Sequence, residues 1–340
     1  MRRRNREYRL RACARVLAGI LVAWHPAQSA SAGPQQDAAD APQTASDVPR
    51  TADGRPDLGG VWSFATAAPL ERPDQFGDKA VLTEEEAAAY VASLPTDGCR
   101  IINCDGSVSA DVETAYGIQW WDWGDTLSQN RTSLIVDPPN GRIPELAQAA
   151  QEARQQRFAR FRGGQSLQSI QNRSLSDRCI VGSSDGPPYR PFAYNNHIQV
   201  FQTPDRVAIL NEMIHSVRVV WLDRPGLPSN IRQWHGDPRG RWEGDTFVIE
   251  TANFRPDSTS NGSAFPDQFQ LEERFTRLDA DTLLYQYTMD DPQTWTQPWT
   301  VQIALARMTD AVYEYACFEG NYSMENILRG ARVQELEAAR

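Results

Sequence analysis

The sequence is poor in several residue types. It holds one lysine, four histidines and five cysteines in 340 residues, and its longest apolar run, residues 16–24, is too short to span a bilayer. P-loop and GxGxxG motifs are absent, so we expect no nucleotide or other organic cofactor. There is also no internal sequence repeat. An apolar fraction of 40% is nevertheless enough for a globular core.

The first 32 residues are typical of an export signal. A basic stretch, residues 1–15, precedes the short apolar run, and Ala-Ser-Ala at 30–32 forms a small-residue cleavage site. Removing its seven Arg and one Glu lowers the formal net charge from −10 to −16. Such a field repels nucleic acid and anionic lipid. We therefore expect an exported protein, periplasmic or extracellular, with no nucleic-acid partner and no membrane span. The alternative is a basic, disordered N-terminus.

Four cysteines remain after the signal is removed: Cys99, Cys104, Cys179 and Cys317. An even number in an exported protein favours disulfides, for which three connectivities exist. We favour pairing Cys99 with Cys104 and Cys179 with Cys317. A zinc site is the competing interpretation, and the absence of any CxxC spacing weighs against it.

The mature chain divides into a linker and one domain. Residues 33–50 are rich in Ala, Gln, Asp, Pro and Ser and predict a disordered linker, whereas 51–340 predicts a single β-rich domain. Helical insertions are expected near 83–94, which opens with a capping box, and near 144–162. Residues 163–196 are irregular, and a long loop of this kind in a compact domain is often functional or a lid.

Short apolar runs with turn residues between them predict the fold. After Asn196 we expect eight strands, at 197–203, 206–213, 215–222, 245–252, 269–277, 282–290, 298–306 and 311–317. Gly60-x-Trp62 at an earlier strand is typical of how lipocalin-like barrels begin, and it is equally consistent with a tryptophan in any β-core. The fold class expected is mainly β: an antiparallel up-and-down barrel, calycin- or lipocalin-like, or a strongly curled sheet, with a few peripheral helices.

Several long phrases occur together in this chain: PRTADGRPDLGGVWSF, RTSLIVDPPNGRIP, QTPDRVAILNEMIHSVRVV, GDPRGRWEGDTFVIETANF and EYACFEGNYSMENILRGAR. In this order they resemble a family of exported bacterial proteins of uncharacterised function, and the resemblance covers most of the chain beyond Pro49. It implies a location in the bacterial cell envelope and a β-rich, calycin-like body. It implies no catalytic residues.

The candidate catalytic residues lie between Asn211 and Asp245. Strand alternation places Asn211 and His215 on one face, and an inward His215 would be a general base in an apolar cavity. Glu212, Asp237 or Glu243 would orient it. The alternative is that these acids only form turns and surface ion pairs.

A second set of residues is expected to bind the ligand. It comprises Asn211, Arg218, Trp234, His235, Glu273, Trp120, Trp121 and Tyr322. The tryptophan cluster near residue 120 is equally consistent with packing beneath a loop.

Three functions follow from these residues. The favoured one is an enzyme that acts on a small apolar or aromatic molecule by cofactor-independent acid/base chemistry, as a cyclase, isomerase, lyase or hydrolase. The alternative is a lipocalin-like carrier that only binds such a molecule. A weaker alternative is a zinc enzyme with His197, His215 and His235 as ligands, which requires the three imidazoles to converge.

Overall fold

The computed structural model describes residues 48–100, 104, 117, 120–162, 167–258 and 262–340. The predicted export signal and almost all of the predicted linker lie outside these ranges. The last linker residue, Arg50, is described and forms an ion pair with Asp245 at 2.6 Å. The described fold therefore includes the end of the segment for which we predicted disorder.

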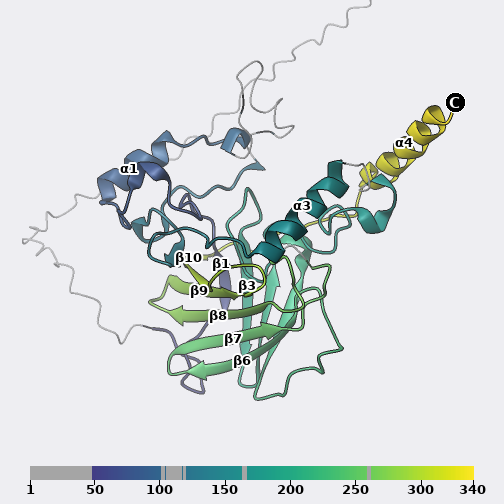
Figure 1. Cartoon of the computed structure of the whole chain (residues 1–340). Coiled ribbons are helices and arrows are strands. Elements are labelled where there is room, and N and C mark those ends of the chain that lie inside the picture. Colours follow the sequence, from purple (N-terminus) through teal and green to yellow (C-terminus); the bar gives the residue numbers. More distant parts are fainter. Residues whose placement is uncertain (1–47, 101–103, 105–116, 118–119, 163–166, 259–261) are drawn as a thin grey trace, which may run out of the picture. The chain divides into compact units, whose positions relative to one another are not determined.

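Nine of the described strands close into a barrel, which confirms the predicted barrel (Figure 1). They are β1 (Gly60–Ser63), β3 (His197–Thr203), β4 (Arg206–Asn211), β5 (Val217–Leu222), β6 (Asp237–Glu243), β7 (Thr246–Ala252), β8 (Gln270–Arg277), β9 (Thr282–Asp290) and β10 (Trp299–Met308). Strands pair in this order, and β1 closes the ring by pairing with β10, where Val61 lies opposite Met308. A further strand, β2 (Ile135–Asp137), pairs with β10 and lies at the end of the sheet.

Alternation of apolar and polar residues explains why these segments form a barrel. The inward residues of β9 and β10 are Leu283, Tyr285, Tyr287, Met289, Trp299, Val301, Ile303 and Leu305, and all are buried. In a strand, alternate side chains share a face, so such a pattern gives one apolar face for the interior. Trp62 of β1 joins this core, and the guanidinium of Arg277 lies 4.6 Å from the centre of its ring.

One pair of neighbouring strands is parallel, namely β5 and β6. Their register holds only two residue pairs, Trp221 with Arg239 and Leu222 with Gly240. The prediction of a purely antiparallel meander is therefore wrong at this point, because residues 223–236 carry the chain back before β6 begins. We call the junction between the two strands the β5–β6 seam.

Two strand assignments differ from the prediction. No strand was predicted between residues 222 and 245, where β6 lies. This strand contains Pro238 and Gly240, and a Cβ at position 240 would lie 2.7 Å from Phe247, so glycine serves close packing there. Residues 311–317 form no strand. The Tyr313 N–H donates at 3.1 Å to the side chain of Glu212 instead of to a neighbouring strand.

The described helices are few and peripheral, as expected: α1 (Glu84–Ser93), α3 (Gln148–Arg162) and α4 (Ser323–Ala338). The predicted capping box is present, since Thr83 accepts from the Glu86 N–H and Glu86 accepts from the Thr83 N–H. Short 3₁₀ turns lie at Asp74–Phe76, Gly98–Arg100, Ser128–Asn130, Ile170–Asn172 and Met213–His215. In the part of the chain that the structure describes, none of the helices has the length and apolar character needed to cross a bilayer.

Both predicted disulfides are confirmed. Cys99 is bonded to Cys104, and Cys179 is bonded to Cys317. The first closes a short loop with a sequence separation of 5, and the second joins positions 138 residues apart. The second bond ties the segment after β10 to the irregular segment that precedes β3.

Candidate functional site

The centre of the barrel holds a buried ion pair. Arg218 and Glu273, both predicted to bind ligand, face each other there, and Nη1 and Nη2 of Arg218 donate to the two carboxylate oxygens at 3.1 and 2.5 Å. Tyr285 donates to Glu273 at 2.8 Å, and Arg218 donates to the hydroxyl of Tyr189 at 3.3 Å. Burial is the largest influence on Arg218 and disfavours its charge, but the charge and hydrogen bonds of Glu273, together with Tyr189 and Tyr285, raise the pKa of Arg218. The expected internal ligand cavity is filled at this point by the protein's own side chains.

His215 lies outside the barrel, so the prediction that it faces an internal cavity is wrong. It ends the 3₁₀ turn between β4 and β5, its side chain is exposed, and its Nδ1 lies 3.2 Å from the carbonyl oxygen of Tyr315. Alternation fails here because Ile214 and His215 have positive φ angles of 62° and 47°, which interrupt the extended chain. The imidazole therefore contacts a backbone carbonyl and not the carboxylate that a base would need.

Glu212 and Asn211 hold the same turn together. Glu212 is buried, its Oε2 lies 2.7 Å from Nδ1 of His197, and its Oε1 accepts from the Tyr313 N–H. Asn211 is buried and donates to the carbonyl oxygen of Ser184 at 3.0 Å. Neither side chain lies beside His215 as predicted, because both turn toward partners on other segments.

The two remaining acids predicted to be catalytic also have partners of their own. Glu243 lies on the outer surface of the barrel and pairs with Arg274 at 2.7 Å. Asp237 is buried, accepts from the Leu227 N–H at 2.6 Å and pairs with Arg239 at 2.7 Å. Asp237 thus holds the connection between β5 and β6 in place, although it does lie on the wall of a pocket.

The predicted aromatic ligand residues do not come together. Trp120 and Tyr322 are 62% and 72% exposed, and Trp121 stacks on Trp123 with ring centres 5.4 Å apart. None of the three predicted residues lines either of the pockets described below. The Trp121 contact agrees with the packing alternative that the sequence left open.

A histidine–carboxylate pair lies at the β5–β6 seam. Nε2 of His235 is 3.0 Å from Oδ2 of Asp185, whose side chain is fully buried. The other carboxylate oxygen of Asp185 accepts a hydrogen bond from the hydroxyl of Ser216. Three separate segments thus supply the cluster: the loop before β3, the start of β5 and the end of the β5–β6 connection. Ser216 fixes the carboxylate, and the carboxylate fixes the imidazole ring.

Gly236 allows His235 to reach this position. The chain turns there with a φ of 69°, in the left-handed region that favours glycine. A Cβ at this position would lie 2.7 Å from the carbonyl oxygen of Ala252 and 2.6 Å from the side chain of Thr251. The close approach of Gly236 to β7 therefore sets the entry into β6 and, with it, the place of the imidazole.

His235 of this pair lines a cavity of about 780 Å³ that we call the arginine-lined pocket. The residues that line it include Val217, Arg218, Val219, Trp221, Arg224, Leu227, Arg232, Trp234, His235, Asp237, Arg239 and Arg255. Three predicted ligand residues, Arg218, Trp234 and His235, therefore line one pocket. The side chain of His235 is 21% exposed, so the ring is accessible from the pocket while Asp185 fixes its orientation.

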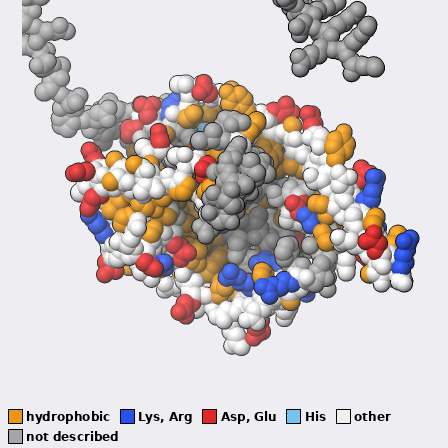
Figure 2. Space-filling view, turned by 90° about the horizontal axis from the view of Figure 1, so that it is seen from above, with side chains coloured by type: hydrophobic (Ala, Val, Ile, Leu, Met, Phe, Trp, Pro, Cys, Tyr) orange, Lys and Arg blue, Asp and Glu red, His pale blue; other side chains and the backbone are white. Residues whose placement is uncertain are grey.

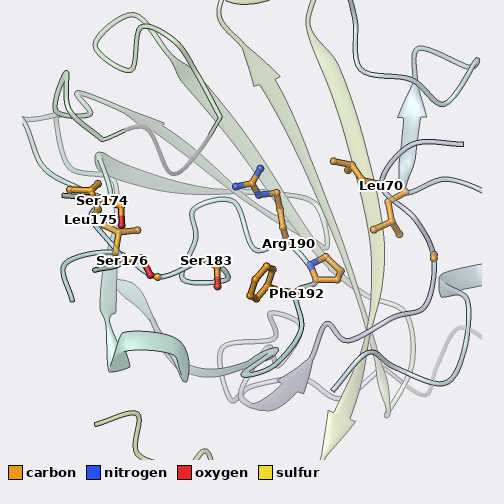
Figure 3. Close-up of a pocket in the computed structure, with 12 residues that line it drawn as sticks. Leu70, Ser174, Leu175, Ser176, Ser183, Arg190 and Phe192 are labelled. Atoms are coloured by element: carbon orange, nitrogen blue, oxygen red, sulfur yellow. The ribbon is translucent and has the colours of Figure 1, made fainter. Parts of the chain in front are cut away.

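A second cavity, of about 500 Å³, is mostly apolar; we call it the apolar pocket (Figure 3). Arg190 and Phe192 lie in its middle, Leu70 on one side and Ser174 to Ser176 on the other (Figure 3). The remaining walls come from Ala68, Leu134, Val181, Gly182 and Pro191. Apolar side chains also reach the surface between acidic ones in the view from above (Figure 2). No histidine lines this pocket.

The other histidine–carboxylate pair, His197 with Glu212, lines neither pocket. Burial is the largest influence on His197 and disfavours its charge, but the hydrogen bond and the charge of Glu212 together raise the pKa of His197. Burial likewise disfavours the charge of Glu212, yet hydrogen bonds from His197 and the Tyr313 N–H lower the pKa of Glu212. This pair joins β3, β4 and the segment after β10.

Sequence reasoning missed Asp185, the partner of His235. One signal was available, because Asp185 lies in the irregular stretch for which we predicted a functional loop or a lid. It also lies in Gly182-Ser-Ser-Asp-Gly186, which matches the GxSxG pattern of nucleophile elbows. The context of an elbow is absent, since Ser184 is buried in a loop and donates to the carbonyl oxygen of Asn195. The acid of this motif, and not its serine, lies at the site.

The zinc alternative required the three imidazoles to converge, and they do not. His197 contacts Glu212, His235 contacts Asp185, and His215 contacts a carbonyl group. Across the described ranges, no group of three or more His, Cys, Asp and Glu side chains would hold a metal ion.

Comparison with protein-family models, with curated proteins and with solved structures finds no match to this chain. Its function is therefore inferred below from the geometry of the site.

Proposed function

We propose that this protein binds a small organic molecule in the arginine-lined pocket and acts on it by acid/base chemistry without a cofactor. The observation that carries the proposal is the 3.0 Å contact between His235, on the pocket wall, and the fully buried carboxylate of Asp185. A histidine oriented by a buried carboxylate beside an accessible pocket is a common arrangement for a general base.

The geometry assigns a role to each ring nitrogen of His235. A carboxylate only accepts hydrogen bonds, so the proton between the two groups belongs to Nε2. Nδ1 then carries the lone pair, and no described side chain or backbone group forms a hydrogen bond with it. In this tautomer Nδ1 takes a proton from the bound molecule, and Asp185 stabilises the imidazolium that results. In an isomerase or cyclase the same nitrogen then returns the proton to the molecule, and in a lyase it gives the proton to the leaving group. In a hydrolase Nδ1 instead takes the proton of an attacking water and gives it to the leaving group.

Three histidine and aspartate variants test this proposal against a panel of small unsaturated and aromatic esters, lactones and ketones. We expect turnover by the wild-type protein that falls about 100-fold or more in His235→Asn and Asp185→Asn. His215→Asn is the matched control, because that exposed histidine lies outside the pocket, and it should keep wild-type rates. Turnover that survives His235→Asn would refute the assignment.

A second candidate function is that of a carrier, with the ligand in the apolar pocket. The favouring observation is that this cavity, about 500 Å³ in volume, has mostly apolar walls and no histidine. Cavities of this size and lining are typical of sites for small apolar molecules. A carrier of this kind needs no acid/base group.

Filling the apolar pocket tests the carrier function. Mass spectrometry of small molecules released from the purified protein should detect a ligand in the wild type and lose it in Leu70→Trp, which places an indole in the cavity. Val81→Trp is the control, because Val81 is exposed and does not line the pocket. Release of the same ligand from Leu70→Trp would contradict binding in this pocket.

We also infer that the protein works outside the cytoplasm. Two disulfides in one chain support this, because such bonds persist mainly in oxidising compartments. A fusion of residues 1–47 to alkaline phosphatase, which is active only after export, tests the predicted signal. Activity should disappear when the arginines before residue 16 are replaced by glutamine, and activity that is absent from the intact fusion would contradict export.

A further inference from the structure

We propose that the ligand of the arginine-lined pocket is an organic anion with a flat apolar body, such as an aromatic carboxylate. This inference rests on the proposed function because it places the ligand beside His235. It adds the chemical class of ligand that the pocket binds. Four features of the pocket carry it: its net charge, two arginines without carboxylate partners, a buried nitrogen without a partner, and aromatic walls.

The first feature is the charge of the lining. Five arginines and one acid, Asp237, line the pocket, although the whole chain has a formal net charge of −10. The arginines are Arg218, Arg224, Arg232, Arg239 and Arg255. A concave surface with charge of one sign raises the local concentration of ions of the opposite sign. The pocket is thus a positive region of an acidic protein.

The second feature is that neighbouring acids neutralise only some of these charges. Arg218 pairs with Glu273 and Arg239 pairs with Asp237, so the positive charge of each is already neutralised. Arg255 pairs with Asp257 at the rim.

Arg224 and Arg232 differ from these three. Arg232 donates to the carbonyl oxygens of Phe254 and Asp267 at 3.3 and 3.1 Å, which orients the guanidinium without neutralising it. Arg224 packs on the ring of Trp221 at 3.6 Å, and no described carboxylate lies within ion-pair distance of it. Two positive charges of the pocket therefore remain for a ligand. Guanidinium groups bind carboxylates with two parallel hydrogen bonds.

The third feature is a nitrogen in the same wall. Nε of Arg218 is buried and has no hydrogen-bond partner among the described residues. A buried donor without an acceptor costs free energy, and such groups in native proteins call for an explanation. An acceptor oxygen or a water held at the seam would supply the missing bond.

The fourth feature is the shape of the walls. Trp221 and Trp234 line the pocket together with Val217 and Val219, whose side chains are 56% and 39% exposed. A guanidinium lies over each indole, Arg224 over Trp221 at 3.6 Å and Arg255 over Trp234 at 4.3 Å. Both indoles are half-buried, and their surface beside the guanidinium groups, together with the exposed valines, would contact a flat apolar body, while the arginines bind its charged group. Inorganic phosphate would use only the arginines.

Calorimetric titration with paired probes tests the inference. Aromatic carboxylates from benzoate to 2-naphthoate are compared with their uncharged amides, and inorganic phosphate is the third probe. We expect 2-naphthoate to bind at least about tenfold more tightly than 2-naphthamide at about 20 mM salt, and more weakly at about 0.5 M salt because of screening. Phosphate should bind more weakly than 2-naphthoate, since it leaves the aromatic walls bare.

Two arginine variants provide the matched comparison. Arg224→Gln should lose about tenfold in affinity for 2-naphthoate. Arg206→Gln should not, because Arg206 also packs on Trp221, at 4.4 Å, but pairs with Asp205 and does not line the pocket. Equal affinity of acid and amide, equal effects of the two variants, or no binding by any carboxylate would overturn the inference. If phosphate bound as tightly as 2-naphthoate, the claim that the ligand has a flat apolar body would be overturned.

The His235→Asn variant separates this inference from the proposed catalysis. It should keep the preference for 2-naphthoate over 2-naphthamide, because that preference comes from the arginines and not from the imidazole. Binding of 2-naphthoate by the wild type, with no turnover of any compound in the panel, would leave the ligand class intact and remove the catalytic role. If the wild type turned over only uncharged molecules, and His235→Asn lost this turnover, the catalytic role would stand and the anionic ligand class would fall.

Discussion

Arg218 and Glu273, which lie 55 residues apart in the sequence, meet inside the barrel through two hydrogen bonds of 3.1 and 2.5 Å. Glu273 is fully buried and also accepts from Tyr285, so the pair is part of a polar network in an apolar core. A buried ion pair of this kind need not stabilise a protein more than well-packed apolar residues would. Replacement of only one of the two residues is costly, because the charge of the other then stays buried without a partner.

Replacement of one partner of this pair should destabilise the protein strongly. Glu273→Leu leaves the Arg218 charge buried without a carboxylate, and we expect a loss of about 3–5 kcal/mol in the free energy of unfolding. Urea denaturation measures it. The double variant Arg218→Met with Glu273→Leu should be more stable than Glu273→Leu alone, because no buried charge remains. A double variant that is less stable than the single one would show that the charge of Arg218 is not the source of the loss.

The pair of His197 and Glu212 predicts a stability that depends on pH. The pKa of His197 is raised from 6.5, so its contribution is complete below 6.5 and is lost as the pH rises through the raised value. The pKa of Glu212 is lowered from 4.5, so its contribution is complete above 4.5 and is lost as the pH falls through the lowered value. The pair should therefore stabilise the fold most between pH 4.5 and 6.5.

Denaturation of the wild type and of Glu212→Gln across the pH range measures this contribution. The difference between their free energies of unfolding should be largest inside the window and shrink on both sides. His215→Asn serves as the control, because that imidazole contacts no carboxylate, and its difference from the wild type should not follow this profile. A difference that grows steadily above pH 7 would contradict the raised pKa of His197.

The two disulfides should contribute unequally to stability. Loop-closure entropy assigns about 5 kcal/mol to the bond between Cys179 and Cys317, whose positions are 138 residues apart, and about 2 kcal/mol to the bond between Cys99 and Cys104. Thermal unfolding of Cys179→Ala/Cys317→Ala and of Cys99→Ala/Cys104→Ala compares them. A larger loss from the short loop would mean that packing around it, and not chain entropy, sets its contribution.

Loss of the charge at Glu243 should leave the protein almost unchanged. Its carboxylate lies on the outer barrel surface, where it pairs with Arg241 and Arg274, and exposed pairs contribute little because water and salt screen them. Glu243→Gln should keep the midpoint of thermal unfolding within about 2 °C of the wild type and leave ligand binding intact. A substantial loss of binding would show that Glu243 contributes to the ligand site, contrary to its position on the outer surface.

The barrel was predictable from local patterns because each strand carries its own alternation. Strands β9 and β10 show this most clearly, since their buried residues recur at every second position. Strand β6 was missed because Pro238 and Gly240 have the composition of a turn, and only the packing of Gly240 against Phe247 explains why glycine is there. The parallel pairing of β5 with β6 has no local signature, because it depends on where residues 223–236 return the chain.

The site was only partly predictable for a similar reason. Trp234 and His235 stood out as an aromatic residue and a histidine within turn-rich sequence. Asp185, the partner of His235, lies 50 residues away, and nothing near either residue indicates the contact. Strand alternation selected His215 instead, because two residues with positive φ are not visible in the sequence pattern. The resemblance to exported bacterial proteins stays a prediction.

The short register of β5 with β6 has a consequence for motion. Only two residue pairs join these strands, whereas β8 and β9 share eight. Backbone amides on either side of such a junction exchange with solvent after small local openings, without unfolding of the whole domain. Deuterium uptake should therefore be fastest, among the barrel strands, at the ends of β5 and β6 that face the imidazole of His235. A molecule seated there would bridge both strands and slow that uptake, so occupancy could be followed by exchange even before any reaction is known.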